Sequence, residues 1–280
     1  MRTDWLIINP RSGSYDAALV ETIGTHAAQA GKPLARVIAL GDEDLPDRAA
    51  VEAAGVDRIM ILTGDGTVSA LATALEGWDG ELLVLPGGTM NLLAHALHGD
   101  AEALPIVHAA LAGTAKGVTI PVIVGPDIRA YAGIVAGPTS AWGEVREDMR
   151  NLDLAALAQS VPNALGATLA EGGMTIEGQA AHYTAIYLEP ASEGIRAYGI
   201  LAEHAGHLLA HGWAWVTGDF REGPSEPLPV AGALVLRNEA EAAIDLLVDG
   251  EKRPGTNPLS LRHEQSALRF PSLLGRVDWS

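Results

Sequence analysis

Apolar runs and helical patterns alternate through about the first 125 residues, and this alternation restricts the possible folds most strongly. Four short apolar runs, at residues 5–8, 34–40, 58–62 and 81–85, are each followed by a helix-like segment, and a fifth run spans 117–124. The helix-like segments are 15–30, 44–54 (with Pro46 in its first turn), 68–75, 92–97 and 101–111. Strands that alternate with helices form βαβ units. We therefore predict an α/β domain with a parallel sheet.

Three polar loops, each containing glycine, follow predicted strands at residues 9–14, 63–67 and 86–91. In parallel sheets, ligands bind beyond the carboxyl ends of the strands, where these loops would meet. Glycine lets a ligand approach the main chain, and the helix start that follows favours phosphate. The loops contain neither G-x-x-x-x-G-K-[ST] nor G-x-G-x-x-G. Each one alone is consistent with an ordinary βα turn, but together they predict a phosphate site.

The second half changes character, because strand-like segments there follow one another with few helices between them. We expect strands at 130–136, 173–177, 182–188, 213–217, 231–236, 242–248 and 267–270, helices at 152–169 and 198–210, and a loop at 223–229. This pattern predicts a largely antiparallel β-sandwich. The predicted fold class is thus α/β plus all-β, with domains 1–124 and 125–280. Residues 271–280 could pack back on the first domain.

Acidic residues stand at two predicted strand ends. Asp65 follows the strand 58–62, where it can cap the turn, hold Mg²⁺ beside phosphate, or take a proton from an attacking hydroxyl. Asp249 and Glu251 flank Gly250 after the strand 242–248. Asp-Gly is common in β-turns, so this pair can be a solvated turn. The alternative is a base or a metal-linked carboxylate that faces the phosphate loops across a cleft.

Composition limits the classes of function. A content of 48% hydrophobic residues supports a substantial core, and the lack of cysteine excludes disulfides, thiolate metal sites and a cysteine nucleophile. The net charge of −17 argues against nucleic acid as a partner. No stretch approaches the roughly 20 apolar residues of a spanning helix, and the start does not fit a signal peptide. We predict a cytoplasmic protein, with peripheral contact at the inner membrane face left open.

Four stretches together resemble the diacylglycerol kinase catalytic family, which includes bacterial lipid kinases and the sphingosine and ceramide kinases. Residues 9–13 resemble the family's N-P-x-S-G, and residues 63–67 resemble its G-G-D-G-T. Residues 86–94 resemble P-x-G-T-x-N-x-x-A, and residues 249–251 resemble D-G-E. Each stretch is modest alone, whereas the set in this order is specific.

The resemblance implies a first domain like that of NAD kinases, a β-sandwich behind it, and ATP-dependent, Mg²⁺-dependent phosphorylation of a lipid hydroxyl at a membrane surface. It implies that Asp249 and Glu251 supply the base, with Asp65 as the competing candidate and as the tentative Mg²⁺ ligand. A homodimer is left open. The implied nucleotide-binding residues are Asn9, Pro10, Arg11, Ser12, Gly13, Thr63, Gly64, Asp65, Gly66, Thr67, Gly87, Gly88, Thr89 and Asn91.

Three positions depart from the family pattern. Thr63 replaces the first glycine, Ala70 stands where many members have glutamate, and Leu92 stands where many bacterial members have aspartate. Ala70 and Leu92 remove carboxylates that the family pattern places near the nucleotide. Since leucine at the position of Leu92 also occurs in sphingosine-type members, the resemblance slightly favours a sphingoid lipid or ceramide as the substrate. Two alternatives to a lipid kinase remain: an NAD kinase-like enzyme, and a non-catalytic relative that binds nucleotide or lipid.

Overall fold

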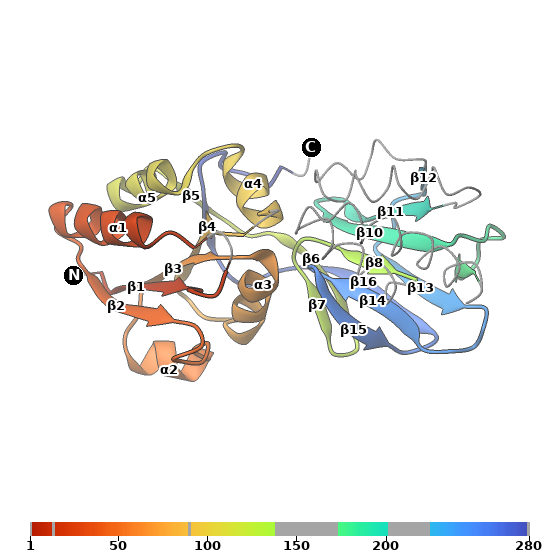
Figure 1. The fold of residues 1–280 in the computed structure, drawn as a ribbon. Helices are drawn as coiled ribbons and strands as arrows, with labels where there is room; N and C mark the ends of the chain where they lie inside the picture. The colour runs from red at the N-terminus through yellow and green to blue at the C-terminus, as the bar shows by residue number, and fades with distance from the viewer. Residues whose placement is uncertain (1, 13–14, 89–90, 138–172, 201–224, 279–280) are drawn as a thin grey trace, which may run out of the picture. The chain divides into compact units, whose positions relative to one another are not determined.

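The chain folds into two compact units. The computed structural model describes residues 2–12, 15–88, 91–137, 173–200 and 225–278. Unit 1 consists of Met1–Ile120 together with Gln265–Ser280, and unit 2 consists of Pro121–Glu264 (Figure 1). The chain therefore leaves unit 1, builds unit 2 and returns. None of the described helices has the length and apolar character that crossing a bilayer requires.

A four-stranded parallel sheet forms the centre of unit 1, as predicted. Its strands are β1 (Asp4–Ile8), β2 (Leu34–Ala39), β3 (Arg58–Thr63) and β4 (Glu81–Pro86), in the spatial order β2-β1-β3-β4. Because β1, β3 and β4 are neighbours, the loops that follow them lie together at the carboxyl edge of the sheet. Ile8 pairs with Leu62, and Thr63 pairs with Pro86, at this edge.

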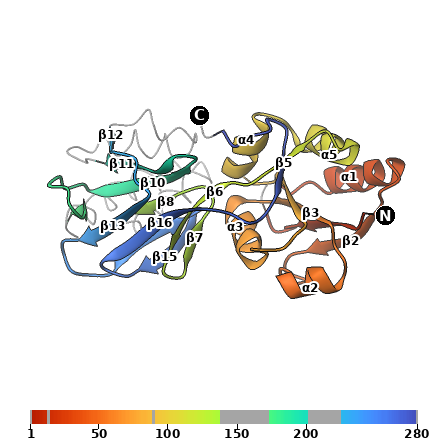
Figure 2. The ribbon, with the colours of Figure 1, turned by 180° about the vertical axis from the view of Figure 1, so that it is seen from behind.

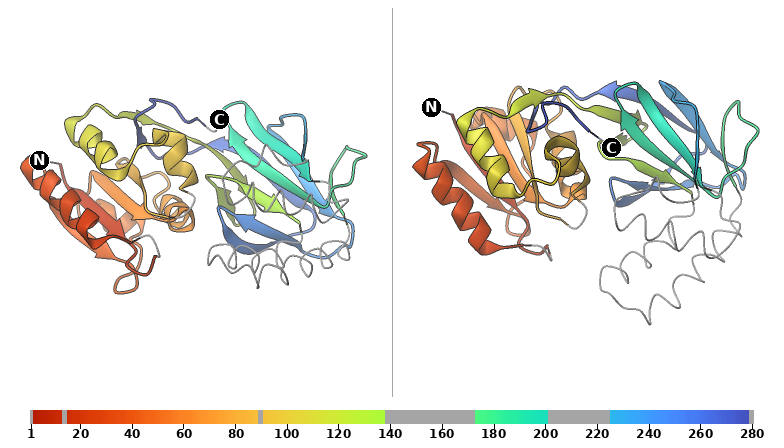
Figure 3. Two further views of the ribbon diagram at one scale, coloured as in Figure 1. Left: turned by 45° about the horizontal axis from the view of Figure 1, so that its top comes forward. Right: turned by 90° about the horizontal axis from the view of Figure 1, so that it is seen from above.

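Helices cover both faces of this sheet. They are α1 (Ala17–Gln29), α2 (Arg48–Ala53), α3 (Asp65–Ala74), α4 (Leu92–His98) and α5 (Ala103–Ala112). Figure 3 shows α1 and α5 side by side, and alternate strand residues such as Leu6, Met60 and Leu83 form one core cluster with them. The residues between, such as Ile7 and Ile61, are also fully buried. Burial on both faces explains why the strands are continuous apolar runs.

The helix starts follow from their caps. Asp16 accepts N–H bonds from Ala18 and Leu19 at the start of α1, and Asp47 accepts one from Ala50 at the start of α2. The prediction that a helix begins at residue 44 with Pro46 in its first turn is therefore wrong, because Pro46 precedes the cap. Helix α3 begins at Asp65, three residues earlier than predicted.

The strand predicted at 117–124 is divided where the chain leaves unit 1. Strand β5 (Lys116–Val118) ends before β6 (Pro121–Gly125), and proline is suited to the first position of a strand because it donates no N–H. β5 pairs with β17 (Phe270–Ser272) of the returning segment, drawn in blue in Figure 2. Leu268 and Phe270 are fully buried, so the return completes the packing of unit 1.

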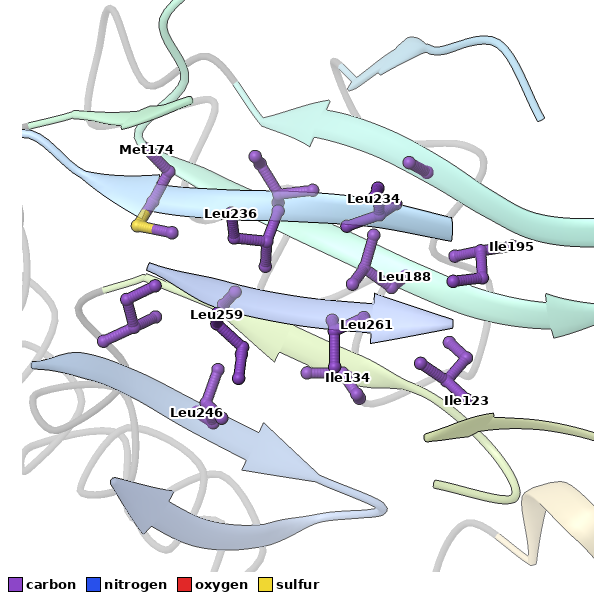
Figure 4. Packing of buried hydrophobic residues seen from close by; sticks show 14 of the residues in the cluster. Ile123, Ile134, Met174, Leu188, Ile195, Leu234, Leu236, Leu246, Leu259 and Leu261 are labelled. Carbon is purple, nitrogen blue, oxygen red and sulfur yellow. The ribbon is translucent and has the colours of Figure 1, made fainter. Parts of the chain in front are cut away.

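Unit 2 contains two β-sheets, in agreement with the predicted fold class. One has the order β12-β11-β10-β8-β14-β15, and the other has the order β7-β6-β16-β13-β9. Their inner faces share one core cluster, in which Leu188 and Leu246 from the first sheet meet Leu236, Leu259 and Leu261 from the second (Figure 4). The further strands are β7 (Ile128–Ala130), β8 (Ile134–Ala136), β9 (Met174–Ile176), β10 (Ala185–Ala191), β11 (Gly194–Ile200), β12 (Ser225–Pro227), β13 (Ala233–Asn238), β14 (Ile244–Val248), β15 (Glu251–Gly255) and β16 (Leu259–Gln265).

Several predicted elements of the second half were wrong. The strand 130–136 is interrupted between β7 and β8, and the loop 223–229 contains β12. The start of the helix 198–210 is in fact the end of β11, because Tyr198 pairs with Tyr187 of β10. β15 and β16 were not predicted. The helix 152–169, the strand 213–217 and the rest of 198–210 lie outside the described residues.

Candidate nucleotide site in unit 1

The start of α3 lies directly at the end of β3. Thr63 is buried, Gly64 is the N-cap residue of α3, and Asp65 is its first residue. The N–H groups of Thr67 and Val68 donate to the Gly64 carbonyl, each at 3.1 Å. The N–H groups that precede Thr67 at a helix start have no i−4 carbonyl partner, and they carry the positive end of the helix dipole. This start is therefore suited to bind phosphate oxygens.

The loops after β3 and β4 pack with their backbones in contact. A Cβ atom built on Gly88 would lie 2.6 Å from the Cα of Gly64, and one on Gly87 would lie 2.5 Å from the carbonyl carbon of Leu62. Carbon atoms that are not bonded do not approach so closely. Only glycine fits at residues 87 and 88, and the result is a narrow junction of main chain beside the start of α3.

Asn91 holds the third loop in shape. Its backbone is left-handed, with φ of 53°, and its Oδ1 accepts the Gly88 N–H at 2.6 Å while its Nδ2 donates to the Gly88 carbonyl at 3.0 Å. The side chain closes the turn on itself, and contact between Asn91 and a nucleotide stays a prediction. Thr89, between these residues in sequence, lies outside the described residues.

Asp65 joins two helix starts. Its Oδ1 accepts the N–H of Leu93, in the first turn of α4, at 3.3 Å. Burial raises the pKa of this carboxyl, and the amides of Leu93, Leu92 and Asn91 act in the opposite direction. From the sequence, Asp65 could cap its own turn. In the structure its carboxylate accepts an N–H from the first turn of the neighbouring helix, α4.

The loop after β1 is tied to the loop after β4. The Asn9 carbonyl accepts the Ser12 N–H at 3.0 Å, and Ser12 Oγ donates to the Gly87 carbonyl at 3.4 Å. Arg11 is exposed, and its guanidinium lies against Gly41, beyond the end of β2. Since β2 flanks β1 on the side away from β3, this cation lies away from the glycine junction. Gly13 lies outside the described residues.

The main-chain N–H groups around this junction suit an anion such as phosphate better than a bare metal ion. The glycine junction leaves the main chain open to phosphate oxygens, and α3 presents its positive end there. In the described ranges, no three histidine or acidic side chains gather to hold a metal. Ala70 and Leu92 offer no carboxylate, so Asp65 is the acidic side chain at the start of α3. Mg²⁺ commonly takes one or two carboxylates and completes its shell with phosphate and water.

The acidic pair of unit 2 has a different environment. Asp249 and Gly250, with φ of 47° and 87°, form the two-residue turn between β14 and β15, as in a type I′ hairpin. The Asp249 carboxylate is buried and accepts three N–H bonds at 2.7–2.9 Å, from Tyr131, Ala132 and Gly133. Those three amides interrupt the strand predicted at 130–136. Glu251, two residues later, is exposed.

Sequence reasoning missed the partners of both aspartates. Leu93 lies 28 positions from Asp65, and the three partners of Asp249 lie 116 to 118 positions away. All of these partners are main-chain N–H groups, which every residue except proline carries. The only available signal was Gly133, whose missing side chain leaves room beside Tyr187, where a Cβ would lie 2.9 Å from the ring.

The sequence of unit 1 also matches a known family model. Residues 4–123 match the model described as the diacylglycerol kinase catalytic domain. These residues are similar to that catalytic domain. Among curated proteins, no match to the chain was found. The family segment contains the glycine junction, Asp65 and the loop after β1.

Solved structures related to this kinase family share the fold of the chain. A putative diacylglycerol kinase from Bacillus anthracis str. Sterne aligns with a TM-score of 0.62 at 16% identity, covering 97% of this chain and 96% of its own. A structure titled as a diacylglycerol kinase from the same organism aligns with a TM-score of 0.64 at 14% identity, covering 97% of both chains. At these identities, the likeness concerns the fold.

Proposed function

We propose that this protein is an ATP-dependent lipid kinase, in which unit 1 binds the nucleotide and unit 2 binds the lipid. The lipid hydroxyl would attack the γ-phosphorus, the bond from that phosphorus to the ADP oxygen would break, and a carboxylate would accept the hydroxyl proton. The acceptor would be diacylglycerol or a sphingoid or ceramide lipid. The observation that carries the proposal is the backbone junction of Gly64, Gly87 and Gly88 at the start of α3, within the family segment.

We assign phosphate binding chiefly to main-chain groups. The first turn of α3 and the loops 9–13 and 86–91 would bind the triphosphate, because Arg11 is the cation of these loops and lies against Gly41. When bound, Mg²⁺ would neutralise charge on the phosphates, with Asp65 as its protein ligand. Asp65 thus orients the polyphosphate while its other interactions hold α4.

For the base, we propose Glu251 rather than Asp249. Three N–H bonds occupy most of the lone pairs of the buried Asp249 carboxylate, while Glu251 is exposed. Asp249 is then a positioning residue that holds the 131–133 turn and the hairpin that carries Glu251. Asp65 remains the competing base in unit 1.

Two isosteric variants separate these roles. If Glu251 is the base, Glu251→Gln lowers kcat by roughly 10²–10⁴-fold with ATP affinity and thermal unfolding unchanged. Asp65→Asn should instead weaken ATP binding in the presence of Mg²⁺. A Glu251→Gln enzyme with wild-type kcat would transfer the base role to Asp65.

The direct test is transfer of labelled γ-phosphate from ATP to diacylglycerol, monoacylglycerol, ceramide and sphingosine in mixed micelles, with NAD as a further acceptor, with and without Mg²⁺. Label on one lipid supports the proposal and names its acceptor. Label on NAD alone would make the protein an NAD kinase-like enzyme and contradict the lipid assignment.

A second candidate is a non-catalytic relative that binds nucleotide. It is favoured by the contact of Asp65 with the start of α4 and by the absence of carboxylates at Ala70 and Leu92. ATP binding by calorimetry, together with no label on any acceptor, would support this candidate. Gly88→Ala serves as the control that should abolish the binding.

A further inference from the structure

Two neighbouring leucines of the returning segment are exposed to solvent. Among the described residues, the large apolar side chains that are exposed are Tyr15, Val37, Val230, Leu273 and Leu274. Single exposed apolar side chains are normal and need no explanation. Leu273 and Leu274, with exposed fractions of 37% and 44%, are the pair in this set that is adjacent in sequence. An adjacent pair presents a larger continuous apolar surface to water.

These leucines stand on a turn that is fixed to α4. Ser272 Oγ lies 2.6 Å from the Leu97 carbonyl oxygen and accepts the Gly275 N–H at 3.0 Å. The N–H of Asp278 donates to the Ala96 carbonyl at 2.8 Å. Figure 1 shows this part of the chain beside α4. The turn 273–275 is therefore anchored on both sides, and the anchors use main-chain groups and a serine rather than the leucine side chains.

A buried histidine also supports this turn. His98 Nε2 lies 3.0 Å from the Val84 carbonyl, and its Nδ1 lies 3.4 Å from the Leu273 N. The carbonyl requires a proton on Nε2, so Nδ1 accepts from Leu273. His98 thus links β4, α4 and the turn. The turn is thus held in place with both leucine side chains exposed, which makes them available for contact with something outside the chain.

Basic side chains border the two leucines. The Lys116 side chain lies against Gly275, where a Cβ atom would be 2.9 Å from its Cδ. Arg276 is largely exposed and pairs with Asp278 at 2.6 Å. Asp278 offsets the charge of Arg276, so Lys116 leaves a net positive charge beside the leucines, whereas the protein as a whole carries a formal net charge of −17. Apolar side chains bordered by lysine and arginine are the composition that binds an anionic bilayer surface.

We propose that the turn 273–275, together with Lys116 and Arg276, inserts into the headgroup region of an anionic phospholipid bilayer. The proposal rests on the proposed lipid kinase function, because an enzyme with a lipid acceptor must reach the bilayer that holds it. The global negative charge opposes adsorption elsewhere on the surface, and the local cations and leucines select this contact. The four side chains named here take no part in the nucleotide site.

The test is cosedimentation of the full-length protein with vesicles, measured without ATP. The vesicles are phosphatidylcholine alone or phosphatidylcholine with phosphatidylglycerol. We expect binding to the mixed vesicles, and at least about a tenfold weaker partition for the double variant Leu273→Ser with Leu274→Ser. Lys116→Gln should lower binding to the anionic vesicles alone. Val37→Ser, an equally exposed apolar residue on β2, is the matched control and should bind like wild type.

Several outcomes would overturn the membrane contact. One is wild-type protein that binds neither kind of vesicle. Another is a double variant that binds the mixed vesicles as well as wild type does. A change in oligomeric mass by sedimentation equilibrium, without vesicle binding, would assign the leucines to a contact between two copies of the chain. Transfer of phosphate to a short-chain, water-soluble acceptor is measured in parallel. If that transfer is absent while vesicle binding depends on the leucines, the kinase assignment fails and the membrane contact stands.

Discussion

Asp65 and Asp249 show how differently two acidic residues in similar sequence settings can be used. Both follow a strand and stand next to glycine, and both accept main-chain N–H bonds from a distant segment. Asp65 remains half-buried at the carboxyl edge of the parallel sheet, where phosphate is expected. Asp249 is buried and accepts three bonds. The exposure of the carboxylate, rather than the residue type, separates a reactive candidate from an anchor.

Replacing Asp249 by asparagine tests its role as an anchor. The amide nitrogen of asparagine would face a main-chain N–H, so we expect unit 2 to lose about 2–4 kcal/mol of stability. The measurement is denaturant unfolding followed by circular dichroism, and Asp245→Asn on the same hairpin is the matched control. Wild-type stability combined with complete loss of phosphotransfer would instead make Asp249 the base.

Gly88→Ala tests the backbone junction. The new Cβ would lie 2.6 Å from the Cα of Gly64, which cannot move without displacing the start of α3. We expect at least a tenfold loss of ATP affinity by calorimetry, together with lower stability. Gly24→Ala is the control, because its Cβ would meet only Leu34 Cδ1 at 4.0 Å within α1 and should stabilise the helix by about 0.5–1 kcal/mol. Unchanged ATP affinity in Gly88→Ala would remove this junction from the nucleotide site.

At the scale of elements, α4 is held at both ends by buried groups. Asp65 accepts an N–H of its first turn, and His98, its last residue, bonds to Val84 of β4. Such a short helix is marginal on its own, so these tertiary bonds and its buried leucines define it. The proposed nucleotide site and the 273–275 turn therefore share one supporting helix.

The protonation of His98 should make stability depend on pH. Burial lowers the pKa of His98 to about 4, below the value of 6.5 expected in the unfolded chain. Between these values, the unfolded state binds more protons than the folded state, so stability falls as pH drops from 6.5 to 4. The loss is about 3 kcal/mol for this group.

His98→Gln should remove this dependence, because glutamine can donate to a carbonyl and does not titrate. The measurement is urea unfolding at a series of pH values between 7 and 4, with the exposed His95→Gln on the same helix as the control. Parallel pH profiles for wild type and His98→Gln would contradict the assigned protonation.

The elements of unit 1 could be predicted because their signals are local. Strands β1, β3 and β4 of its sheet are largely apolar runs buried on both faces, and two of its helices begin after an aspartate that caps them. β15 and β16 could not be predicted so easily. β15 is an exposed edge strand of the sequence Glu-Lys-Arg-Pro-Gly, a composition that prevents edge pairing, and it is a strand only because β14 pairs with it. The positions of the loop residues were predictable for the same local reason, while their hydrogen-bond partners were not.

At the scale of the whole molecule, the returning segment is a structural part of unit 1. Phe270 is fully buried and sits on β17, which pairs with β5, and the Arg269 carbonyl accepts the N–H of Leu82 in β4 at 2.9 Å. Residues 4–123, which match the family model, therefore do not include all of the residues that form the core of unit 1.

Phe270→Ala tests this dependence. Removing a fully buried phenylalanine should destabilise unit 1 by about 3–5 kcal/mol, even though the residue lies far along the chain. Hydrogen exchange of the β3 and β4 amides reports on unit 1 directly, and Leu273→Ala, an exposed neighbour, should change it little. Exchange that is unaffected by Phe270→Ala would show that unit 1 folds without the return.

The return also has a consequence for synthesis of the chain. Residues 265–280 leave the ribosome only after all of Pro121–Glu264, which at usual translation rates takes roughly 10–30 s. Unit 2 is continuous in sequence and can fold once β16 has emerged, while the buried surface that Leu268 and Phe270 will cover stays open until the returning segment follows. A nascent chain would thus complete the core of unit 2 before that of unit 1.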